Sequence, residues 1–290
     1  MDPGFISKKA IKDIFKASGQ QPFRGLGQNF LISQGVLRKI IESAGLSSND
    51  TVLEIGPGLG SLTQELAKRV KRVVAVEKDR RMADFLEKNL KHFKNLEIIE
   101  GDILKIKNLK ATLRGVRFAS SKIKNYKVVA NLPYYITSPV IRKFLESENQ
   151  PKIMVLMVQK EVGQRIVARP PKMNLLTVAV QFYAKAKIID YVSKNCFWPR
   201  PKVDSAILRI APLIKTNRKL INADIFFKVV KAGFSQPRKQ LANNLAKKLK
   251  LDKEATKNWL LENKINPGQR PETLSINNWL ELVKNWTTTK

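Results

Sequence analysis

Side chains that could bind a nucleoside follow four short apolar runs of this 290-residue sequence. The first run, "TVLEIG", leads into a glycine cluster that begins at Gly56, and the second, "RVVAVE", ends in Glu77. The third, "LEIIEGD", ends in Asp102, and the fourth, "KVVANLPYY", contains Asn131. Glycines let a backbone approach a ligand closely, whereas carboxylate and amide groups form hydrogen bonds with hydroxyl and amino groups.

The glycines and the two acids each have a functional and a purely structural interpretation. Gly56, Gly58 and Gly60 are spaced G-x-G-x-G, which differs from the dinucleotide fingerprint and argues against a nicotinamide or flavin cofactor. Any tight turn also needs glycine. Glu77 could accept hydrogen bonds from both hydroxyls of a ribose, or could be a surface acid before a helix. Asp102 could accept a hydrogen bond from an adenine amino group, or could cap the next turn.

The segment "NLPYY" combines an amide, a restricted backbone and an aromatic face. Asn131 offers both an acceptor and a donor, and Pro133 limits the backbone so that the Leu132 carbonyl is held at a set angle. Tyr134 could stack on a nucleobase. The structural alternative is a proline-containing turn with its tyrosine in the core, and we assign Tyr135 to this alternative.

Taken in order, the four strand ends predict a nucleoside cofactor beside a target base. In an open α/β sheet, ligands bind at the carboxyl ends of the strands. Methyl transfer from a sulfonium donor to an exocyclic adenine amine fits this set, because the cofactor carries the reactivity and the protein supplies alignment. Hydrogen bonds from that amine to Asn131 and to the Leu132 carbonyl would favour its pyramidal, nucleophilic form.

The elements that position these residues alternate between strand and helix from Thr51 to Phe144. This alternation predicts a mostly parallel, doubly wound sheet, a Rossmann-like α/β fold. Ser61 and Ser138 are the expected N-caps of two helices, with Pro139 at a first helical position. The runs "LLTVAVQFYAKAKIIDYV" and "SAILRIAPL" predict antiparallel strands added at one edge.

The pattern changes after about Leu213, where β-rich runs stop and four segments have helical spacing. We therefore predict two domains: 1–213 for cofactor and target adenine, and 214–290 as a small helical RNA-binding domain, with a linker near 212–217. Basic residues are concentrated in two segments. Residues 106–127 hold seven Lys/Arg and no acid, and residues 215–250 hold ten Lys/Arg and one acid.

Composition narrows the function further. With 54 Lys and Arg against 24 Asp and Glu, the formal charge is +30, which favours a nucleic-acid partner and a monomer. Acidic lipid is the second possible partner, and lysine-rich usage without any partner is the other alternative. The single Cys and single His exclude a disulfide scaffold and argue against a metal site. There is no apolar run of membrane-spanning length and no signal-peptide core, so we expect a cytoplasmic protein without a membrane partner.

Nine motifs of this sequence resemble those of the ribosomal RNA adenine N6-dimethyltransferases of the KsgA type. They lie between Gly25 and Ser275 and read "GLGQNFL", "EIGPGLGSLT", "VEKD", "GD", "NLPYYITSP", "QKEVGQRI", "FWPRPKVDS", "FSQPRKQLANNL" and "RPETLS". The resemblance implies S-adenosylmethionine as donor. It also implies two adjacent adenosines near the 3′ end of small-subunit ribosomal RNA as target, each methylated twice, within naked RNA or an assembling small subunit.

The resemblance also implies roles for individual residues. Asn29 and Leu31 would close over the cofactor, Gly56 would line its amino-acid end, Glu77 would bind its ribose and Asp102 its adenine. Asn131 would touch both cofactor and target amine, and Tyr134 and Phe197 would sandwich the target base. The implied catalytic residues are therefore Asn131, Leu132, Pro133, Tyr134 and Phe197.

Two stretches depart from the family pattern, and three rival functions stay open. Residues 168–178 lack the glycine and tyrosine that often occur there, and the basic stretch 106–127 is somewhat longer than usual. The rivals are a 23S rRNA adenine N6-methyltransferase, a non-catalytic RNA-binding factor on the same fold, and a DNA adenine methyltransferase. The motifs "FWPRPKVDS", "FSQPRKQLANNL" and "RPETLS" favour the small-subunit enzyme.

Overall fold

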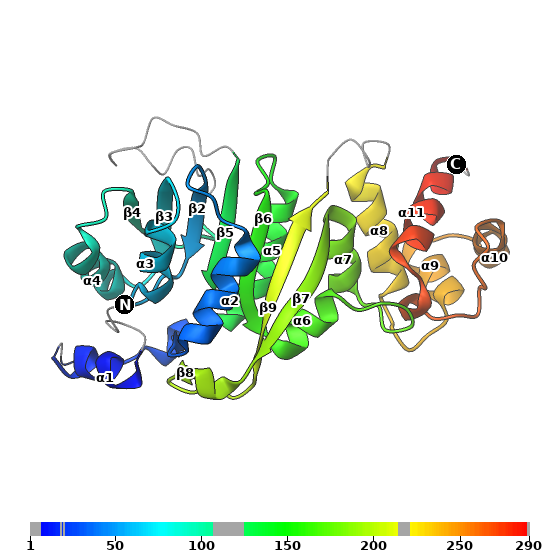
Figure 1. Cartoon of the computed structure of the whole chain (residues 1–290). Helices are drawn as coiled ribbons and strands as arrows, with labels where there is room; N and C mark the ends of the chain where they lie inside the picture. The colour runs from blue at the N-terminus through cyan, green and yellow to red at the C-terminus, as the bar shows by residue number, and fades with distance from the viewer. Residues whose placement is uncertain (1–6, 18, 20, 107–124, 214–220, 289–290) are drawn as a thin grey trace. The chain divides into compact units, whose positions relative to one another are not determined.

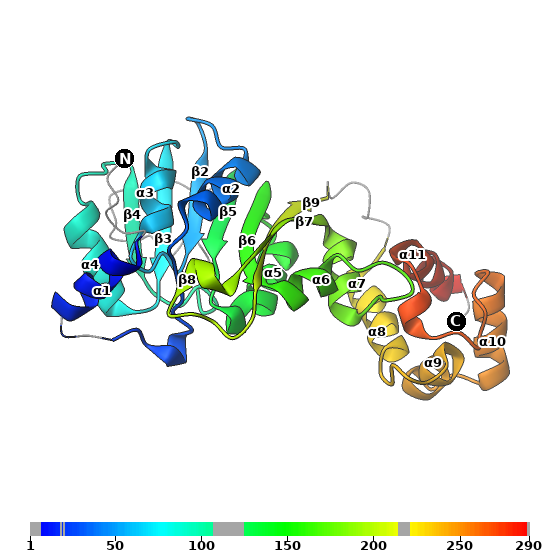
Figure 2. The ribbon, with the colours of Figure 1, turned by 60° about the horizontal axis from the view of Figure 1, so that its bottom comes forward.

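The computed structural model describes residues 7–17, 19, 21–106, 125–213 and 221–288, and the chain divides into two compact units (Figures 1 and 2). Unit 1 comprises residues 1–163 and 187–212, and unit 2 comprises 164–186 and 213–290. Residues 164–186 thus group with the C-terminal helices, although the sequence pattern placed them in the first domain. The basic stretch and the linker fall largely outside the described residues, at 107–124 and 214–220.

A seven-stranded mixed sheet forms the centre of unit 1, with the strand order β4-β3-β2-β5-β6-β9-β7 (Figure 1). Strands β2 to β6 run parallel, and β9 is antiparallel to β6. The strands are β2 (Thr51–Ile55), β3 (Arg72–Glu77), β4 (Leu96–Glu100), β5 (Tyr126–Asn131), β6 (Ile153–Gln159), β7 (Ala184–Val192) and β9 (Ser205–Pro212). The predicted parallel sheet and the antiparallel β9 are confirmed.

Helices cover both faces of this sheet because its parallel strands are apolar on both sides. Helices α2 (Gln34–Ala44) and α3 (Ser61–Ala67) share one buried cluster with Val129 of β5. Tyr126 points to the other face, where its ring lies 6.4 Å from that of Phe144 on α5 (Thr137–Glu146). Helix α4 (Arg80–Leu90) packs on β3 and β4, and α6 (Lys160–Ile166) follows β6 and crosses from unit 1 into unit 2.

A two-stranded antiparallel sheet joins distant parts of unit 1. Strand β1 (Phe30–Leu31) pairs with β8 (Phe197–Trp198), so that Phe30 lies opposite Trp198. Helix α1 (Lys8–Ala17) packs on this pair through Phe15, whose ring centroid lies 5.5 Å from that of Phe30 and 5.9 Å from that of Trp198. The N-terminal helix is therefore held by aromatic contacts to two segments far apart in the sequence.

Unit 2 is helical, as the spacing predicted for its C-terminal part. It contains α7 (Leu175–Tyr183), α8 (Ala223–Gly233), α9 (Leu241–Leu249), α10 (Lys253–Glu262) and α11 (Ile276–Lys284). Short 3-10 helices lie at Arg24–Leu26, Tyr134–Ile136 and Lys194–Cys196 in unit 1, and at Pro271–Thr273 and Asn285–Thr288 in unit 2. Trp279 and Phe226 are fully buried in the core of unit 2.

Residues 175–183 form helix α7, so the predicted strand over this part of "LLTVAVQFYAKAKIIDYV" is wrong. Val178 and Phe182, four residues apart, lie on one helical face and are buried in the core of unit 2, where Phe182 stacks on Phe226 at 4.2 Å. Asn174 caps the helix by accepting a hydrogen bond from the Thr177 amide at 3.1 Å. Packing against α8 therefore outweighs the strand preference of the β-branched residues.

Both predicted serine caps are also wrong. Helix α3 begins at Ser61, and Gly60 is its N-cap with φ of +84°. Helix α5 begins at Thr137 because the 3-10 turn Tyr134–Ile136 leads directly into it, which places Ser138 and Pro139 inside the first turn. Across the described part of the chain, none of the helices has the length and apolar character needed to cross a bilayer.

Gly60 is a position where a side chain should destabilise unit 1. A Cβ atom there would lie 2.7 Å from Leu86 and 2.9 Å from Leu90, in a backbone conformation that other residues rarely adopt. We expect Gly60→Ala to lower the free energy of unfolding by about 1–3 kcal/mol, measured by urea denaturation. Gly35→Ala in α2 is the control, because nothing lies within 4 Å of its Cβ position, and it should stabilise by up to about 1 kcal/mol. Equal stability of the two variants would contradict this prediction.

Candidate active site

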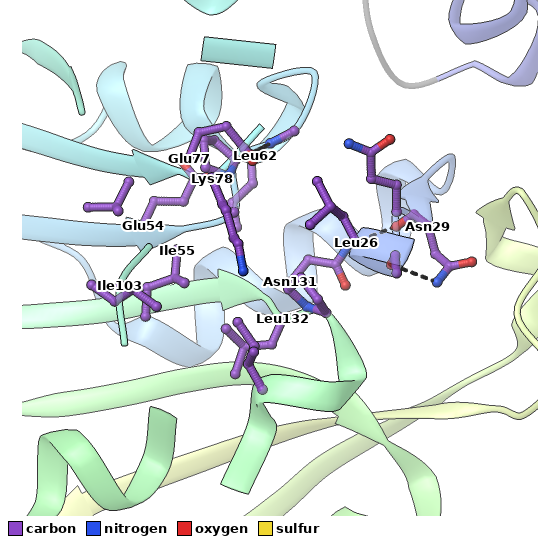
Figure 3. Close-up of a pocket in the computed structure, with 18 of the residues that line it drawn as sticks. Leu26, Asn29, Glu54, Ile55, Leu62, Glu77, Lys78, Ile103, Asn131 and Leu132 are labelled. Atoms are coloured by element: carbon purple, nitrogen blue, oxygen red, sulfur yellow. Dashed lines mark hydrogen bonds between the residues drawn. The ribbon is translucent and has the colours of Figure 1, made fainter. Parts of the chain in front are cut away.

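A pocket opens at the carboxyl ends of the parallel strands, where the sequence predicted a ligand site (Figure 3). Its lining includes all six residues predicted to bind the cofactor: Asn29, Leu31, Gly56, Glu77, Asp102 and Asn131. It also includes three of the predicted catalytic residues: Leu132, Pro133 and Tyr134. The structure thus brings together nine of the ten predicted residues, from segments that lie up to about a hundred positions apart.

The glycine loop and Glu77 form one hydrogen-bonded unit. Gly56, Gly58 and Gly60 all have positive φ angles, which turn the chain from β2 into α3 without side chains over the pocket. The Gly58 amide donates to Glu77 Oε2 at 3.0 Å, and the Asp79 amide donates to Oε1 at 2.9 Å. Burial raises the pKa of the Glu77 carboxyl, and the amides of Asp79 and Gly58 oppose this rise. The Lys78 amide also lowers this pKa, and a carboxylate can accept about four hydrogen bonds in all, so Glu77 can still accept from a ligand.

Asp102 lies across the pocket and forms an ion pair with Lys78. The distance from Lys78 Nζ to Asp102 Oδ2 is 3.0 Å, and the Leu104 amide donates to Oδ1 at 2.9 Å. Burial raises the pKa of the Asp102 carboxyl, but these two hydrogen bonds outweigh it and leave the pKa below its ordinary value. Asp102 is therefore an ionised acceptor, and the Lys78 ammonium competes with any ligand amine for it.

Glu54 is a pocket residue that the sequence analysis missed. It lies on β2, two residues before Gly56, and is only 1% exposed although it lines the pocket. Its Oε2 atom has no hydrogen-bond partner among the described residues. Burial raises the pKa of the Glu54 carboxyl to about 8, and the negative charge of Glu77 acts in the same direction. An acid at an interior strand position was itself an available signal, because strands buried on both faces are otherwise apolar.

Asn131 is held in a defined orientation at the end of β5. Its Nδ2 group donates to the Asn29 carbonyl at 3.1 Å, and the Asn29 side chain in turn donates to the Gly27 carbonyl at 3.0 Å (Figure 3). The Leu132 amide donates to the Met157 carbonyl of β6 at 3.3 Å. Because Nδ2 serves as the donor, the amide is set with Oδ1 as the acceptor for a ligand.

The two tyrosines of "NLPYY" point in different directions. Tyr134 is partly buried, its hydroxyl lies 2.8 Å from that of Ser205 on β9, and burial raises its pKa. Tyr135 is 53% exposed and lines the pocket, so its predicted place in the core is wrong. The 3-10 turn Tyr134–Ile136 explains the difference, because consecutive residues of such a turn face different sides.

Phe197 is the one predicted site residue that does not line the pocket. It is 2% exposed and lies opposite Leu31 in the β1–β8 pair, within the cluster that packs α2 and α3 on the sheet. Its predicted stacking on a target base stays a prediction. Among the described residues, no group of three or more His, Cys, Asp or Glu side chains is placed to hold a metal ion.

The sequence of this chain is similar to known proteins of one family. The sequence matches the ribosomal RNA adenine dimethylase family over residues 21–288. It is 46% identical to the ribosomal RNA small subunit methyltransferase A of Dehalococcoides mccartyi, over 91% of this chain and 88% of that protein. It is 42% identical to the protein of the same description from Clostridium botulinum, over 89% of this chain and 92% of that protein.

Two solved structures resemble this one over most of its length. A dimethyladenosine transferase from Plasmodium falciparum gives a TM-score of 0.71 at 29% identity, covering 89% of this chain and 98% of that one. The 23S rRNA methyltransferase ErmE gives a TM-score of 0.69 at 25% identity, covering 88% of this chain and 98% of that one.

The buried Glu54 should make folding stability depend on pH. Its pKa rises from 4.5 to about 8 on folding, so folding takes up a proton between these values. The stability that comes from the raised pKa of Glu54 is fully present below pH 4.5 and is lost as the pH rises toward 8. We expect the free energy of unfolding, measured by urea denaturation at pH 5 to 8, to fall less steeply with pH in Glu54→Gln than in the wild type. Glu42→Gln, at an exposed position of α2, controls for loss of a charge. Parallel curves for Glu54→Gln and wild type would rule the effect out.

Proposed function

Because the chain belongs to the ribosomal RNA adenine dimethylase family, we propose that the pocket of unit 1 binds S-adenosylmethionine beside a target adenosine. The protein is a small-subunit rRNA adenine dimethyltransferase, which dimethylates adenosines in 16S rRNA. The finer target we propose is two adjacent adenosines near the 3′ end, each methylated twice. The observation that carries the proposal is the convergence of Glu77, Asp102 and Asn131 on one pocket.

The rival functions lose support from different observations. The relatives at 42–46% identity are described as small-subunit enzymes, whereas the 23S rRNA methyltransferase ErmE resembles the chain at 25% identity. A non-catalytic RNA-binding factor has no need to keep the nucleoside acids and the Asn131 segment in one pocket. The family match favours RNA over DNA as the substrate.

The residues of the pocket fit the proposed cofactor. Glu77 would accept hydrogen bonds from the ribose hydroxyls on the lone pairs that the Gly58 and Asp79 amides leave available. Asp102 would accept from the adenine amino group, sharing its carboxylate with Lys78. Gly56 leaves room for the amino-acid end. Glu54 Oε2 has no hydrogen-bond partner among the described residues, and a positively charged ligand group there would draw this carboxyl, whose pKa burial raises to about 8, toward its ionised form. Asn29 and Leu31 would cover the site.

S-adenosylmethionine supplies a methyl group on a positively charged sulfur, which is a good leaving group. The protein's task is to align the adenosine amine and exclude water. Asn131 Oδ1 and the Leu132 carbonyl would accept hydrogen bonds from the two N–H bonds of the amine. This arrangement draws the nitrogen lone pair out of conjugation with the ring and toward the methyl donor. The bond from Asn131 Nδ2 to the Asn29 carbonyl would hold the acceptor in place.

The target base needs a flat surface, and Tyr134 would provide one. Pro133 limits the backbone before it, and the hydrogen bond with Ser205 restrains the ring. Phe197 as the second face of the sandwich would require the ring to leave its buried position. The proposed target is a base within ribosomal RNA, so an adenosine in a base stack would have to leave it to reach the pocket.

We propose that residues 214–290 bind RNA as a small helical domain, while 1–213 carry the transferase. Seven basic residues of α8, α9 and their flanks are exposed: Lys228, Lys231, Arg238, Lys239, Lys247, Lys248 and Lys250. Within the described ranges, none of the seven pairs with a carboxylate. Such a set binds phosphates without reading sequence. Self-repulsion at +30 favours a monomer, and a ribosomal substrate places the activity in the cytoplasm.

The test is methyl transfer from labelled S-adenosylmethionine to small ribosomal subunits that lack the modification, with mass mapping of the RNA. We expect four methyl groups on two neighbouring adenosines near the 3′ end. Methylation of 23S rRNA instead, or no transfer to small subunits and to their naked RNA, would overturn the assignment.

Substitution of Asn131 should lower turnover, whereas substitution of Glu77 should weaken cofactor binding. Asn131→Ala removes the acceptor for the target amine, so turnover should fall by at least about a hundredfold while the cofactor dissociation constant changes little. Glu77→Ala removes the ribose acceptor, so the cofactor dissociation constant, measured by calorimetry, should rise about tenfold or more. Wild-type turnover in Asn131→Ala, or an unchanged constant in Glu77→Ala, would remove that residue from its role.

A further inference from the structure

Two large aromatic side chains are exposed on or next to segments that line the pocket: Tyr135 in the lining itself, and Phe23 three residues before the lining residue Leu26. Phe23 is 54% exposed and Tyr135 is 53% exposed, and Tyr135 also lines the pocket. Apart from Tyr191, they are the only aromatic residues with such exposure among the large hydrophobic side chains of the described residues. An aromatic ring exposed to water loses the stabilisation that burial would give. Two exposed rings near one binding site therefore indicate that a ligand covers them.

The two rings share one short loop. The Phe23 ring lies 3.2 Å from the Cβ position of Gly25, and the Tyr135 ring lies 3.6 Å from that of Gly27. Gly27 has φ of +63° and also lies 3.6 Å from Pro133 by the same measure. Gly25, inside the 3-10 turn Arg24–Leu26, therefore lies beside the Phe23 ring, and Gly27, directly after the turn, lies beside the Tyr135 ring.

This loop is held in place by hydrogen bonds. The Phe23 amide donates to Gln28 Oε1 at 2.7 Å, and the Gln28 side chain donates to Asp79 Oδ2 at 2.8 Å. The Leu26 amide donates to the Phe23 carbonyl at 3.1 Å. Asp79 is the N-cap of α4 and is itself buried. These hydrogen bonds fix the loop, so Phe23 is held at a defined position with its ring exposed.

We propose that Phe23 and Tyr135 form a stacking platform for the unpaired RNA bases that flank the adenosine in the pocket. This inference rests on the proposed function. When an adenosine leaves its stack to reach the pocket, the neighbouring bases lose a stacking partner, and an exposed aromatic ring replaces it. A nucleic-acid occupant fits the net charge of +30 better than an apolar peptide does.

The arrangement of the "NLPYY" segment supports this division of roles. Tyr134 faces inward and is restrained through Ser205, whereas the next residue, Tyr135, faces outward. One turn then serves the target base with its first tyrosine and a flanking base with its second. Because stacking tolerates any base, the platform would add affinity and hold the flanking nucleotides, without selecting sequence.

The test uses the full-length protein and a short RNA hairpin whose loop carries two adjacent adenosines, with 2-aminopurine in place of the adenosine next to the target. RNA affinity is measured by fluorescence anisotropy at low salt, and stacking by quenching of 2-aminopurine. We expect Phe23→Ala and Tyr135→Ala each to weaken RNA binding about tenfold, with loss of quenching. Tyr135→Phe should stay within about twofold of wild type, because the ring face is kept.

Tyr191→Ala is the matched control. Tyr191 is 49% exposed on β7 of unit 1 but does not line the pocket, so its loss should leave RNA affinity and quenching unchanged. The proposal is overturned if Phe23→Ala and Tyr135→Ala both bind RNA within about twofold of wild type, or if Tyr191→Ala weakens binding equally. It is also overturned if Tyr135→Ala weakens S-adenosylmethionine binding alone, because the ring would then serve the cofactor. Absence of methyl transfer by the wild type would instead reject the proposed function, while the platform is judged on RNA affinity alone.

Discussion

The shape of the pocket depends on one buried carboxylate. Glu77, 7% exposed at the end of β3, accepts hydrogen bonds from the amides of Gly58 and Asp79. These bonds tie the glycine loop after β2 to the start of α4, whose cap Asp79 then binds Gln28. A buried carboxylate is costly without such partners, so side chain and loop stabilise each other. Through these contacts Glu77 positions the glycine loop, the start of α4 and, by way of Asp79 and Gln28, the loop that carries Phe23.

The pocket also concentrates carboxyl groups in a very basic protein. Glu54, Glu77 and Asp102 all line it, and they differ in how their charge is balanced. Asp102 is paired with Lys78, Glu77 is held by backbone amides, and Glu54 is buried without a partner for one oxygen among the described residues. The Glu54 carboxyl, with its pKa raised to about 8, is largely uncharged near neutral pH, and a positively charged cofactor would favour its ionised form. The outer surface, in contrast, suits a polyanion. The two binding tasks are thereby separated within one domain.

Much of the fold and site could be predicted because local patterns and tertiary packing agree. The parallel strands carry continuous apolar runs, and the polar residues at their ends lie at the sheet edge where ligands bind. Sequence-based predictions were wrong where tertiary packing determines the local structure. Residues 175–183 became a helix because Phe182 packs on Phe226, and Gly60 took the cap position expected for Ser61. Tyr135 faces outward because of the turn geometry around it. The burial of Glu54 depends on the strands and helices packed around β2, which no local pattern reveals. The position of Phe197 depends on pairing with Leu31, which no local pattern reveals.

The β1–β8 pair has a consequence for biosynthesis. Phe30 and Leu31 pair with Trp198 and Phe197, and Tyr134 needs Ser205 for its hydrogen bond. A chain emerging from the ribosome can form β2, β3 and the glycine loop early, since these are close in sequence. The wall that carries Asn29 and the restraint on Tyr134 must wait until residues 197–205 have been synthesised. The substrate side of the active site can therefore be completed only after most of the chain has been synthesised, late in translation.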